Sequence, residues 1–422
     1  AVGDRQMIAD GPSIWNYLNE AVTENGIDKH IRYGQKVVAA NWSDEDRRWE
    51  LTIDRGGEEI QLNAGFLWAC SGYYNYDEGF SPEFPGAADF AGTIVHPQHW
   101  PEDLDYQGKK IVVIGSGATA VTLIPSLVDG GAGHVTMLQR SPTYIGALPL
   151  EDPVAAQANK YLPKNMAHFV NRWKAIGYAT GQYQIARRFP SVFKRALRQM
   201  ATRRLPKDFD YDKHFSPRYN PWDERVCLAP NGDLFKAIRS GKADVVTDII
   251  EKFDETGITL ASGQHLDADI IITATGLNMQ LFGGAKALRN GEPIDLTKSM
   301  TYKGLMLSGV PNMAITFGYT NASWTLKADL VSEFICRVLN YMDDNGFDRV
   351  EPQHPGSAVK EEPFMDFTPG YFRRAMDTLP KSGSEAPWRL KQNYFIDLRT
   401  IRYGKVDEES LLFTKHRAAV SA

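Results

Sequence analysis

The chain has 422 residues, which at roughly 100 to 200 residues per domain predicts two to four domains with substantial cores. Apolar residues make up 43% and charged residues 23%, so a disordered or collagen-like chain is excluded. The net charge of −5 gives no overall attraction to nucleic acid, and we expect no nucleic-acid partner.

The cysteines and the distribution of apolar residues predict a cytoplasmic protein. Cys70, Cys227 and Cys336 lie far apart and form no C-x-x-C pair, which argues against a disulfide framework and against a structural metal site. No stretch reaches the roughly 18 consecutive apolar residues of a spanning helix, and no signal region is recognisable at the N-terminus. The chain starts at Ala1 without a methionine, which predicts a fragment of a longer sequence.

The first hundred residues predict a helix, a hairpin and a short strand. Asp10-Gly11-Pro12 is typical of a helix start, and Gly26 fits its end. Two alternating runs within residues 37–53 indicate hairpin strands. The apolar run 66–70 predicts another strand, and residues 71–100, with several glycines and prolines, are expected to form a loop.

A βαβ unit is predicted next. The apolar run 109–114 is typical of a parallel strand that is covered on both faces. The stretch 118–128 predicts a helix and 134–138 a second strand, which together give the expected ~30 residues of such a unit. Between the first strand and the helix lies a turn of the form G-x-G-x-x-A, made of Gly115, Ser116, Gly117, Ala118, Thr119 and Ala120.

This glycine turn predicts a dinucleotide site. The first glycine permits the tight turn, the second lets the backbone approach a pyrophosphate, and the small third residue lets helix and strand pack closely. The amide groups at the helix start then face the diphosphate. The alternative is a close-packed turn that binds no ligand.

The end of the second strand indicates which nucleotide binds. An NAD site usually places a carboxylate there, to accept from the ribose hydroxyl. This chain has Gln139, Arg140 and Ser141. A guanidinium binds a 2′-phosphate that a carboxylate would repel, so we expect NADPH, although Arg140 as an ordinary surface arginine is the alternative.

Two further elements are predicted towards the C-terminus. Residues 268–274 form a buried type of strand that ends at Thr275 and Gly276, and residues 326–342 place apolar side chains at the spacing of a long amphipathic helix.

The segment from Pro153 to Lys207 differs from the rest in charge. It holds no Asp or Glu and twelve Lys or Arg, so it carries +12, and the rest of the chain carries −17. Two interpretations stay open: a basic helical insertion that touches a membrane surface or guides an anionic cofactor, or a solvated helical face. The basic residues are Lys160, Lys164, Arg172, Lys174, Arg187, Arg188, Lys194, Arg195, Arg198, Arg203, Arg204 and Lys207.

Residues 90–101 carry the most specific pattern. They match F-x-G-x-x-x-H-x-x-x-W-P, with Phe90, Gly92, His96, Trp100 and Pro101 at the fixed positions. This is the fingerprint of the Baeyer-Villiger monooxygenases, and the chain resembles that family. Further similar segments are 70–77, 138–144, 274–278 and 319–324, and the resemblance is greatest to members that oxidise thioamide prodrugs such as ethionamide.

The resemblance implies an α/β flavoprotein with two dinucleotide-binding (Rossmann-like) domains and a helical insertion. NADPH would reduce a bound FAD, and a peroxyflavin formed with dioxygen would insert one oxygen atom into a ketone or oxidise the sulfur of a thioamide or sulfide. The expected domains are residues 1–100 (FAD, with linker), 101–276 (NADPH, with the insertion 153–207) and 277–422 (FAD).

The resemblance also implies roles for single residues. Arg225 would be the catalytic cation that stabilises negative charge during oxygen transfer; its alternative is a salt bridge to Asp223 or Glu224. His96 would lie at the junction between the domains, where it could relay a proton or anchor the linker by hydrogen bonds; we favour the anchor. Cofactor contacts are expected from Ser71, Gly72, Thr275, Gly276, Asn321 and Ser323, with the Ser323 hydroxyl capping the long C-terminal helix.

One departure from the family pattern is expected to matter. The chain shows no second G-x-G-x-x-G, the motif that would hold the FAD diphosphate, so we expect an N-terminally truncated FAD-binding domain that binds FAD weakly. Two alternatives to a Baeyer-Villiger enzyme stay open: a flavin-containing N- or S-monooxygenase, and a non-catalytic nucleotide-binding fragment. Whether the chain forms a homo-oligomer is also open.

Overall fold

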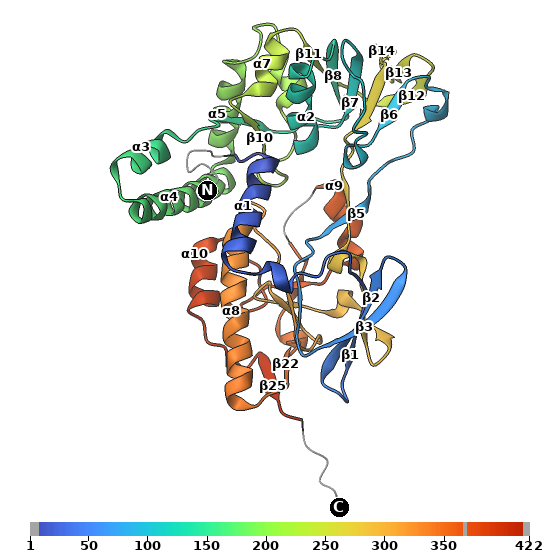
Figure 1. Ribbon diagram of the computed structural model, residues 1–422. Helices are drawn as coiled ribbons and strands as arrows, with labels where there is room; N and C mark the ends of the chain where they lie inside the picture. The colour runs from blue at the N-terminus through green and yellow to red at the C-terminus, as the bar shows by residue number, and fades with distance from the viewer. Residues whose placement is uncertain (1–7, 366–368, 417–422) are drawn as a thin grey trace, which may run out of the picture. The chain divides into compact units, whose positions relative to one another are not determined.

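The computed structural model describes residues 8–365 and 369–416, and the chain divides into two compact units. Unit 1 comprises Ala1–Lys29 and Tyr76–Asn278, and unit 2 comprises His30–Asn75 and Met279–Ala422 (Figure 1). Both units combine helices with sheets that contain parallel strands, so the chain has the α/β fold with two sheet-containing units that the sequence predicts.

Unit 1 is built on a parallel sheet of five strands in the order β11-β8-β7-β15-β6. Its strands are β6 (Thr93–Val95), β7 (Lys110–Ile114), β8 (His134–Gln139), β9 (Ile145–Leu148), β10 (Cys227–Pro230), β11 (Ala243–Thr247), β12 (Ile250–Asp254), β13 (Gly257–Leu260), β14 (His265–Asp267) and β15 (Ile270–Thr273). Its helices are α1 (Gly11–Glu24), α2 (Ala118–Asp129), α3 (Pro153–Tyr161), α4 (Lys164–Arg188), α5 (Pro190–Thr202), α6 (Tyr211–Phe215) and α7 (Asp233–Arg239).

The apolar run of β7 is explained by the two layers that cover its sheet. Ile111 and Val113 pack in a cluster with side chains of α2 and α7. Val112 and Ile114 face the other way, into a cluster with side chains of the antiparallel β12-β13-β14 sheet. Because both faces are buried, every residue of the strand after Lys110 must be apolar.

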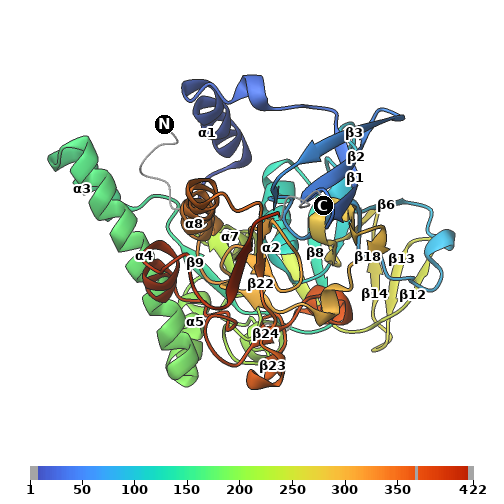
Figure 2. The same cartoon turned by 90° about the horizontal axis from the view of Figure 1, so that it is seen from below.

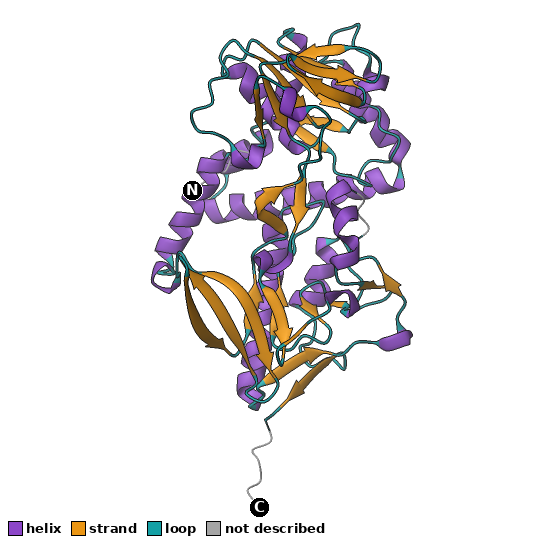
Figure 3. Cartoon of the chain, turned by 90° about the vertical axis from the view of Figure 1, so that its right-hand side faces the viewer, coloured by secondary structure: helices purple, strands orange, loops and turns teal. Residues whose placement is uncertain are grey.

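Unit 2 contains a five-stranded sheet in the order β18-β17-β1-β2-β3, whose long antiparallel strands are drawn in orange in Figure 3. Its strands are β1 (Lys36–Ser43), β2 (Arg48–Arg55), β3 (Glu58–Ala64), β4 (Leu67–Ala69), β17 (Lys286–Arg289), β18 (Glu292–Pro293), β19 (Thr301–Tyr302), β20 (Met306–Leu307), β21 (Met313–Ile315), β22 (Arg349–Pro352), β23 (Glu361–Glu362), β24 (Ser382–Gly383) and β25 (Leu411–Thr414). Its helices are α8 (Trp324–Asn345), α9 (Gly370–Ala375) and α10 (Tyr394–Asp397).

Helix α8 is buried through one stripe of apolar side chains, as its sequence spacing predicts. Leu330, Phe334 and Val338 are fully buried, and Gly346 ends the helix in the left-handed region at φ 64°. A charged network lies at its first turns: Lys327 donates to Asp397 at 2.8 Å, and Tyr319 donates to the same oxygen at 2.7 Å.

The hairpin and the first helix are confirmed. Strands β1 and β2 pair antiparallel, and α1 begins after Asp10, whose carboxylate accepts from the Ser13 amide at 2.7 Å. The prediction of a loop for residues 71–100 is wrong in part, because this stretch contains β5 (Tyr74–Gly79) and β6. Strand β6 has only three residues and forms by pairing with β15, far away in sequence.

Among the described helices, none combines the length and the hydropathy that crossing a membrane requires. The same part of the chain contains no group of three or more His, Cys, Asp or Glu side chains close enough to hold a metal ion.

Candidate functional site

The glycine turn joins β7 to α2 and leaves the start of that helix open. Gly115 has φ 139°, and a Cβ there would lie 2.3 Å from the Ala274 carbonyl oxygen, so only glycine fits. Gly117 is the N-cap of α2; it provides no side-chain cap, and a Cβ built on it would meet no atom within 4 Å. The first amides of α2 therefore face open space, which fits a diphosphate.

The turn contacts the end of β8, where the sequence places the nucleotide-selecting residues. The Ser116 hydroxyl donates to the Ser141 carbonyl at 3.3 Å, and Arg140, the residue directly after β8, is exposed. Gln139 is only 2% exposed, and its amide donates to the His214 carbonyl and the Thr247 hydroxyl. Gln139 thus holds α6 and β11 against β8, whereas Arg140 is accessible to a phosphate.

Thr275 and Gly276 follow β15. The residue before them, Ala274, packs with its carbonyl oxygen against Gly115 of the glycine turn. The Thr275 hydroxyl donates to the Phe80 carbonyl, and the Phe80 amide donates back to the Gly276 carbonyl at 3.0 Å. Gly276 has φ 108° with open space where a Cβ would stand. The structure therefore brings the glycine turn, the β8 end and residues 275–276 together in unit 1.

The fingerprint residues pack tightly in the same unit. A Cβ on Gly92 would lie 2.3 Å from the Asp269 carbonyl oxygen and 2.5 Å from the Phe90 ring. Phe90 is 8% exposed. The Trp100 ring meets the Tyr106 ring edge-on, with centroids 6.4 Å apart, and the Pro101 carbonyl accepts from the Leu104 amide. These positions are explained by packing and turn formation around β6.

His96 begins a short 3₁₀ turn. Its Nδ1 accepts from the Gln98 amide at 3.2 Å, and its ring lies where a Cβ on Gly79 would stand, 2.1 Å away. Burial, and then the nearby His99, lower the pKa of His96 below its ordinary 6.5, against the opposing effect of the Gly276 backbone. The geometry is that of a neutral imidazole that anchors a turn.

We expect this histidine to make stability depend on pH. Because its pKa is lower in the folded chain, its contribution is complete above pH 6.5 and is lost as the pH falls through the folded-state pKa. The melting temperature of wild type minus that of His96→Asn, which keeps a hydrogen-bond acceptor, should shrink between pH 7.5 and 5.5. A difference that stays constant or grows on acidification would contradict this assignment.

Arg225 lies in a loop that α4 holds in place. Trp222 adopts φ 72°, a strained value for a bulky residue, and its ring packs edge-on against Tyr183 at 5.7 Å. Arg187, one turn further along α4, donates to the Asp223 carboxylate at 2.5 Å. The same carboxylate accepts from the Asn220 amide at 2.9 Å and closes the turn before Arg225.

The strand after Arg225 approaches the glycine turn. The Cys227 thiol points to the Ser116 carbonyl oxygen at 3.9 Å, and β10 pairs in parallel with β9. Burial raises the pKa of the Cys227 thiol to about 11, so this cysteine is a protonated packing residue and no nucleophile. Arg225 therefore precedes by two residues a side chain that contacts the glycine turn.

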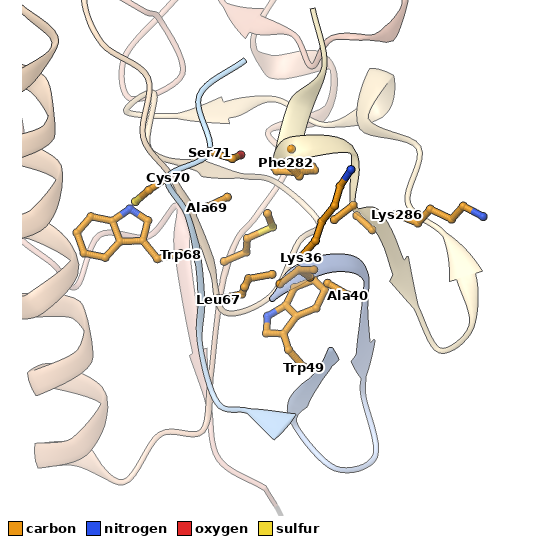
Figure 4. A pocket seen from close by; sticks show the side chains of 15 residues that line it. Lys36, Ala40, Trp49, Leu67, Trp68, Ala69, Cys70, Ser71, Phe282 and Lys286 are labelled. Carbon is orange, nitrogen blue, oxygen red and sulfur yellow. The ribbon is translucent and has the colours of Figure 1, made fainter. Parts of the chain in front are cut away.

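Unit 2 contains an apolar cavity of about 300 Å³ beside Ser71. Strand β4 pairs with β21 on one side, and residues 67–71 line the cavity in succession. Figure 4 shows Trp49, Leu67 and Ala40 next to one another in its wall, with the Lys286 side chain directed away. A cavity of this size and character suits part of a flat ring system. Gly72, with φ 72°, follows directly.

Two residues of unit 2 that we expected to contact the cofactor form hydrogen bonds with other residues of the chain. Asn321 is 7% exposed and donates to the Gln392 carbonyl at 2.9 Å. The prediction that the Ser323 hydroxyl caps α8 is wrong: Ser323 stands at the N-cap but makes no cap hydrogen bond. Its hydroxyl is 2.8 Å from that of Thr325, the second residue of the helix, and this competing partner explains the difference.

Several site residues were not found by sequence reasoning. Gly79, which makes room for His96, stands outside the fingerprint. Tyr183 and Arg187 contact the Arg225 loop through Trp222 and Asp223. Both lie on α4, for which the sequence indicated only a basic helical segment. The cavity draws on β1, β4 and residues 282–287, which share no motif in the sequence.

Comparison with known proteins defines the family. The model of the family described as "Flavin-binding monooxygenase-like" matches residues 7–286, and the chain belongs to this family. The resemblance inferred from the fingerprint is thus confirmed.

Curated relatives agree along nearly the whole chain. The "FAD-containing monooxygenase EthA" of Mycolicibacterium smegmatis is 78% identical over 415 residues, covering 98% of this chain and 84% of the relative. The protein of the same name from Mycobacterium tuberculosis is 59% identical over 416 residues, covering 99% and 85%.

Solved structures share the fold. A complex of OTEMO with FAD and NADP is 18% identical, with a TM-score of 0.70 over 97% of this chain and 86% of that one. A cyclohexanone monooxygenase bound to epsilon-caprolactone is 16% identical, with a TM-score of 0.70 over 97% and 86%.

Proposed function

We propose that this chain is an NADPH- and FAD-dependent monooxygenase that inserts one oxygen atom into ketones and oxidises the sulfur of thioamides or sulfides. Each turnover uses NADPH, a proton, dioxygen and the substrate, and yields NADP⁺, water and the oxygenated product. Two relatives that match nearly the whole chain at 78% and 59% identity are named FAD-containing monooxygenases. The observation that carries the proposal is the open start of α2 at Gly117. Ser116, the residue before it, contacts Ser141 next to Arg140, and it also contacts Cys227, two residues after Arg225.

In this proposal the residues have separate tasks. FAD, when bound, supplies the chemistry that accepts electrons from NADPH and activates dioxygen. Gly115 to Ala120 hold the NADPH diphosphate and Arg140 holds its 2′-phosphate. Arg225 stabilises the negative charge that develops during oxygen transfer. The cavity beside Ser71 and Gly72 fits the apolar part of the flavin, with Asn321 and Ser323 in the same unit.

The nucleotide preference gives a direct prediction. Arg140→Ala should lower kcat/KM for NADPH about 10- to 100-fold, since a charge-assisted hydrogen bond to a phosphate contributes about 1.5–3 kcal/mol. The value for NADH, which has no 2′-phosphate, should be unchanged. Steady-state kinetics with both nucleotides measure the effect, and Arg239→Ala, an exposed arginine of the same unit, is the control. Equal losses for NADPH and NADH would show that Arg140 does not select the nucleotide.

The activity itself is tested with purified protein in excess FAD. We expect NADPH consumption in air to rise when a ketone or a sulfide is added, with an ester or a sulfoxide as product. Sulfoxide without ester would favour the N- or S-monooxygenase alternative. Nucleotide binding without flavin binding or dioxygen consumption would favour a non-catalytic nucleotide-binding protein.

A further inference from the structure

Helices α3 and α4 form a hairpin that extends away from the parallel sheet of unit 1 (Figures 1 and 2). Its inner side is held by small and polar residues. Ala155, Ala158 and Ala167 are buried, and the Asn171 amide donates to the Asn159 side chain at 3.1 Å. An ion pair between Lys174 and Asp152 ties α4 to the N-cap of α3. The contacts named between α3 and α4 thus come from small and polar residues.

Those large side chains are exposed around the turn of the hairpin. Tyr161 is 72% exposed, Phe169 61% and Met166 53%, and Val170 is exposed beside them. Met166, Phe169 and Val170 follow the i, i+3, i+4 spacing and thus share one face of the first turns of α4. Single exposed apolar residues are normal on a protein surface, but a cluster at one protruding turn marks an interaction site.

Basic side chains flank this cluster. Lys160 lies over the Tyr161 ring at 5.1 Å, and Lys164 begins α4; both are exposed. Within the described residues no carboxylate pairs with either lysine, whereas Lys174, Arg187 and Arg198 of the same segment are paired with aspartates. The tip thus combines two lysines that no described carboxylate pairs with and exposed apolar side chains; among the described residues Arg188, Lys194 and Arg195 likewise have no carboxylate partner but lie elsewhere in the insertion.

We propose that this hairpin tip, formed by Lys160, Tyr161, Lys164, Met166, Phe169 and Val170, docks on the surface of a membrane that contains anionic lipids. Aromatic and aliphatic side chains enter the headgroup region, and the lysines attract the anionic headgroups. A protruding, narrow tip suits insertion between lipids, whereas a protein partner needs a broad patch of roughly 800 Å² per side. The tip contains no residue assigned to the nucleotide site or to the Arg225 loop.

The test is flotation of the full chain with vesicles of phosphatidylcholine and of a phosphatidylcholine–phosphatidylglycerol mixture. We expect binding to the mixed vesicles and much weaker binding to neutral ones. Lys160→Glu/Lys164→Glu should lower binding at least about twentyfold, because each lysine near an anionic surface contributes roughly fivefold. Molar salt should have a similar effect on wild type. Tyr161→Ser/Phe169→Ser should lower binding about tenfold at every salt concentration.

A matched control exists on unit 2, where Tyr403 is 75% exposed and stands near the exposed Lys405. Tyr403→Ser/Lys405→Glu should bind vesicles as wild type does, and all variants should keep the wild-type melting temperature and NADPH oxidation rate. The proposal is overturned if wild type does not float with mixed vesicles, if both tip variants float as wild type does, or if neutral vesicles bind equally well. Because flotation needs no turnover, these outcomes are independent of the proposed catalytic activity.

Discussion

Replacement of Arg225 by alanine is expected to lower the rate of product formation about 10²- to 10³-fold, the usual effect of removing one preorganised donor to developing negative charge. Nucleotide affinity should stay unchanged, because the role proposed for Arg225 is limited to oxygen transfer. Product formation by chromatography and NADPH affinity by titration measure the two effects separately. Arg225→Lys keeps the charge without the planar fork and should recover part of the activity.

The control for this prediction is Arg218→Ala, an exposed arginine in the same connection, which should leave both quantities unchanged. A second variant probes the support of the loop. Asp223→Asn weakens the contact with Arg187 and should lower kcat less than Arg225→Ala does. If Arg225→Ala formed product at the wild-type rate, the catalytic assignment of Arg225 would be wrong.

Gly117→Ala is expected to raise the KM for NADPH about 10- to 100-fold without changing the melting temperature. A Cβ at this position meets no protein atom within 4 Å, so the fold accepts it, but the methyl group stands where the diphosphate must approach the α2 amides. The lost charge-assisted contacts correspond to about 1.5–3 kcal/mol. Thermal unfolding and initial-rate kinetics on the same preparation separate the two effects.

Gly115→Ala should behave in the opposite way. Its Cβ would lie 2.3 Å from the Ala274 carbonyl oxygen at φ 139°, so we expect a loss of about 1–3 kcal/mol in the free energy of unfolding. Gly177→Ala, at an equally open position inside α4, should leave the KM for NADPH unchanged and raise the free energy of unfolding by about 0.5–1 kcal/mol, because alanine is the better helix former. If Gly117→Ala bound NADPH as wild type does, the diphosphate would not lie at this turn.

The βαβ unit was predictable because its signals are local. A strand buried on both faces needs an unbroken apolar run, and the glycine turn follows it directly. Each signal within residues 109–138 therefore supports the interpretation of the next one. The long C-terminal helix was predictable for the same reason, since Leu330, Phe334 and Val338 lie within one element.

Other features depend on contacts between distant segments. Strand β6 forms through pairing with β15, and its three residues carry too short a pattern to be recognised among glycines and prolines. The Ser323 hydroxyl had two partners available by sequence, the helix amides and Thr325, and only the structure distinguishes them. The positive φ of Trp222 and its contact with Tyr183 likewise cannot be predicted from the spacing of residues in the sequence.

The fingerprint gave the family but not the physical reason for its residues. In the structure Gly92 is required because Phe90 and the Asp269 carbonyl occupy the space of a side chain, and His96 fits because Gly79 leaves room for its ring. These are packing constraints between β5, β6 and β15, which no single segment reveals.

In the proposed function the chain transfers one atom of dioxygen to an organic substrate while it oxidises NADPH. Mass spectrometry of the product formed from a ketone under ¹⁸O₂, with FAD and NADPH present, tests it most directly. We predict an ester whose mass is raised by a single ¹⁸O atom and one NADPH consumed for each ester formed. Consumption of NADPH with only unlabelled ketone recovered, for a ketone and for a sulfide alike, would contradict the account.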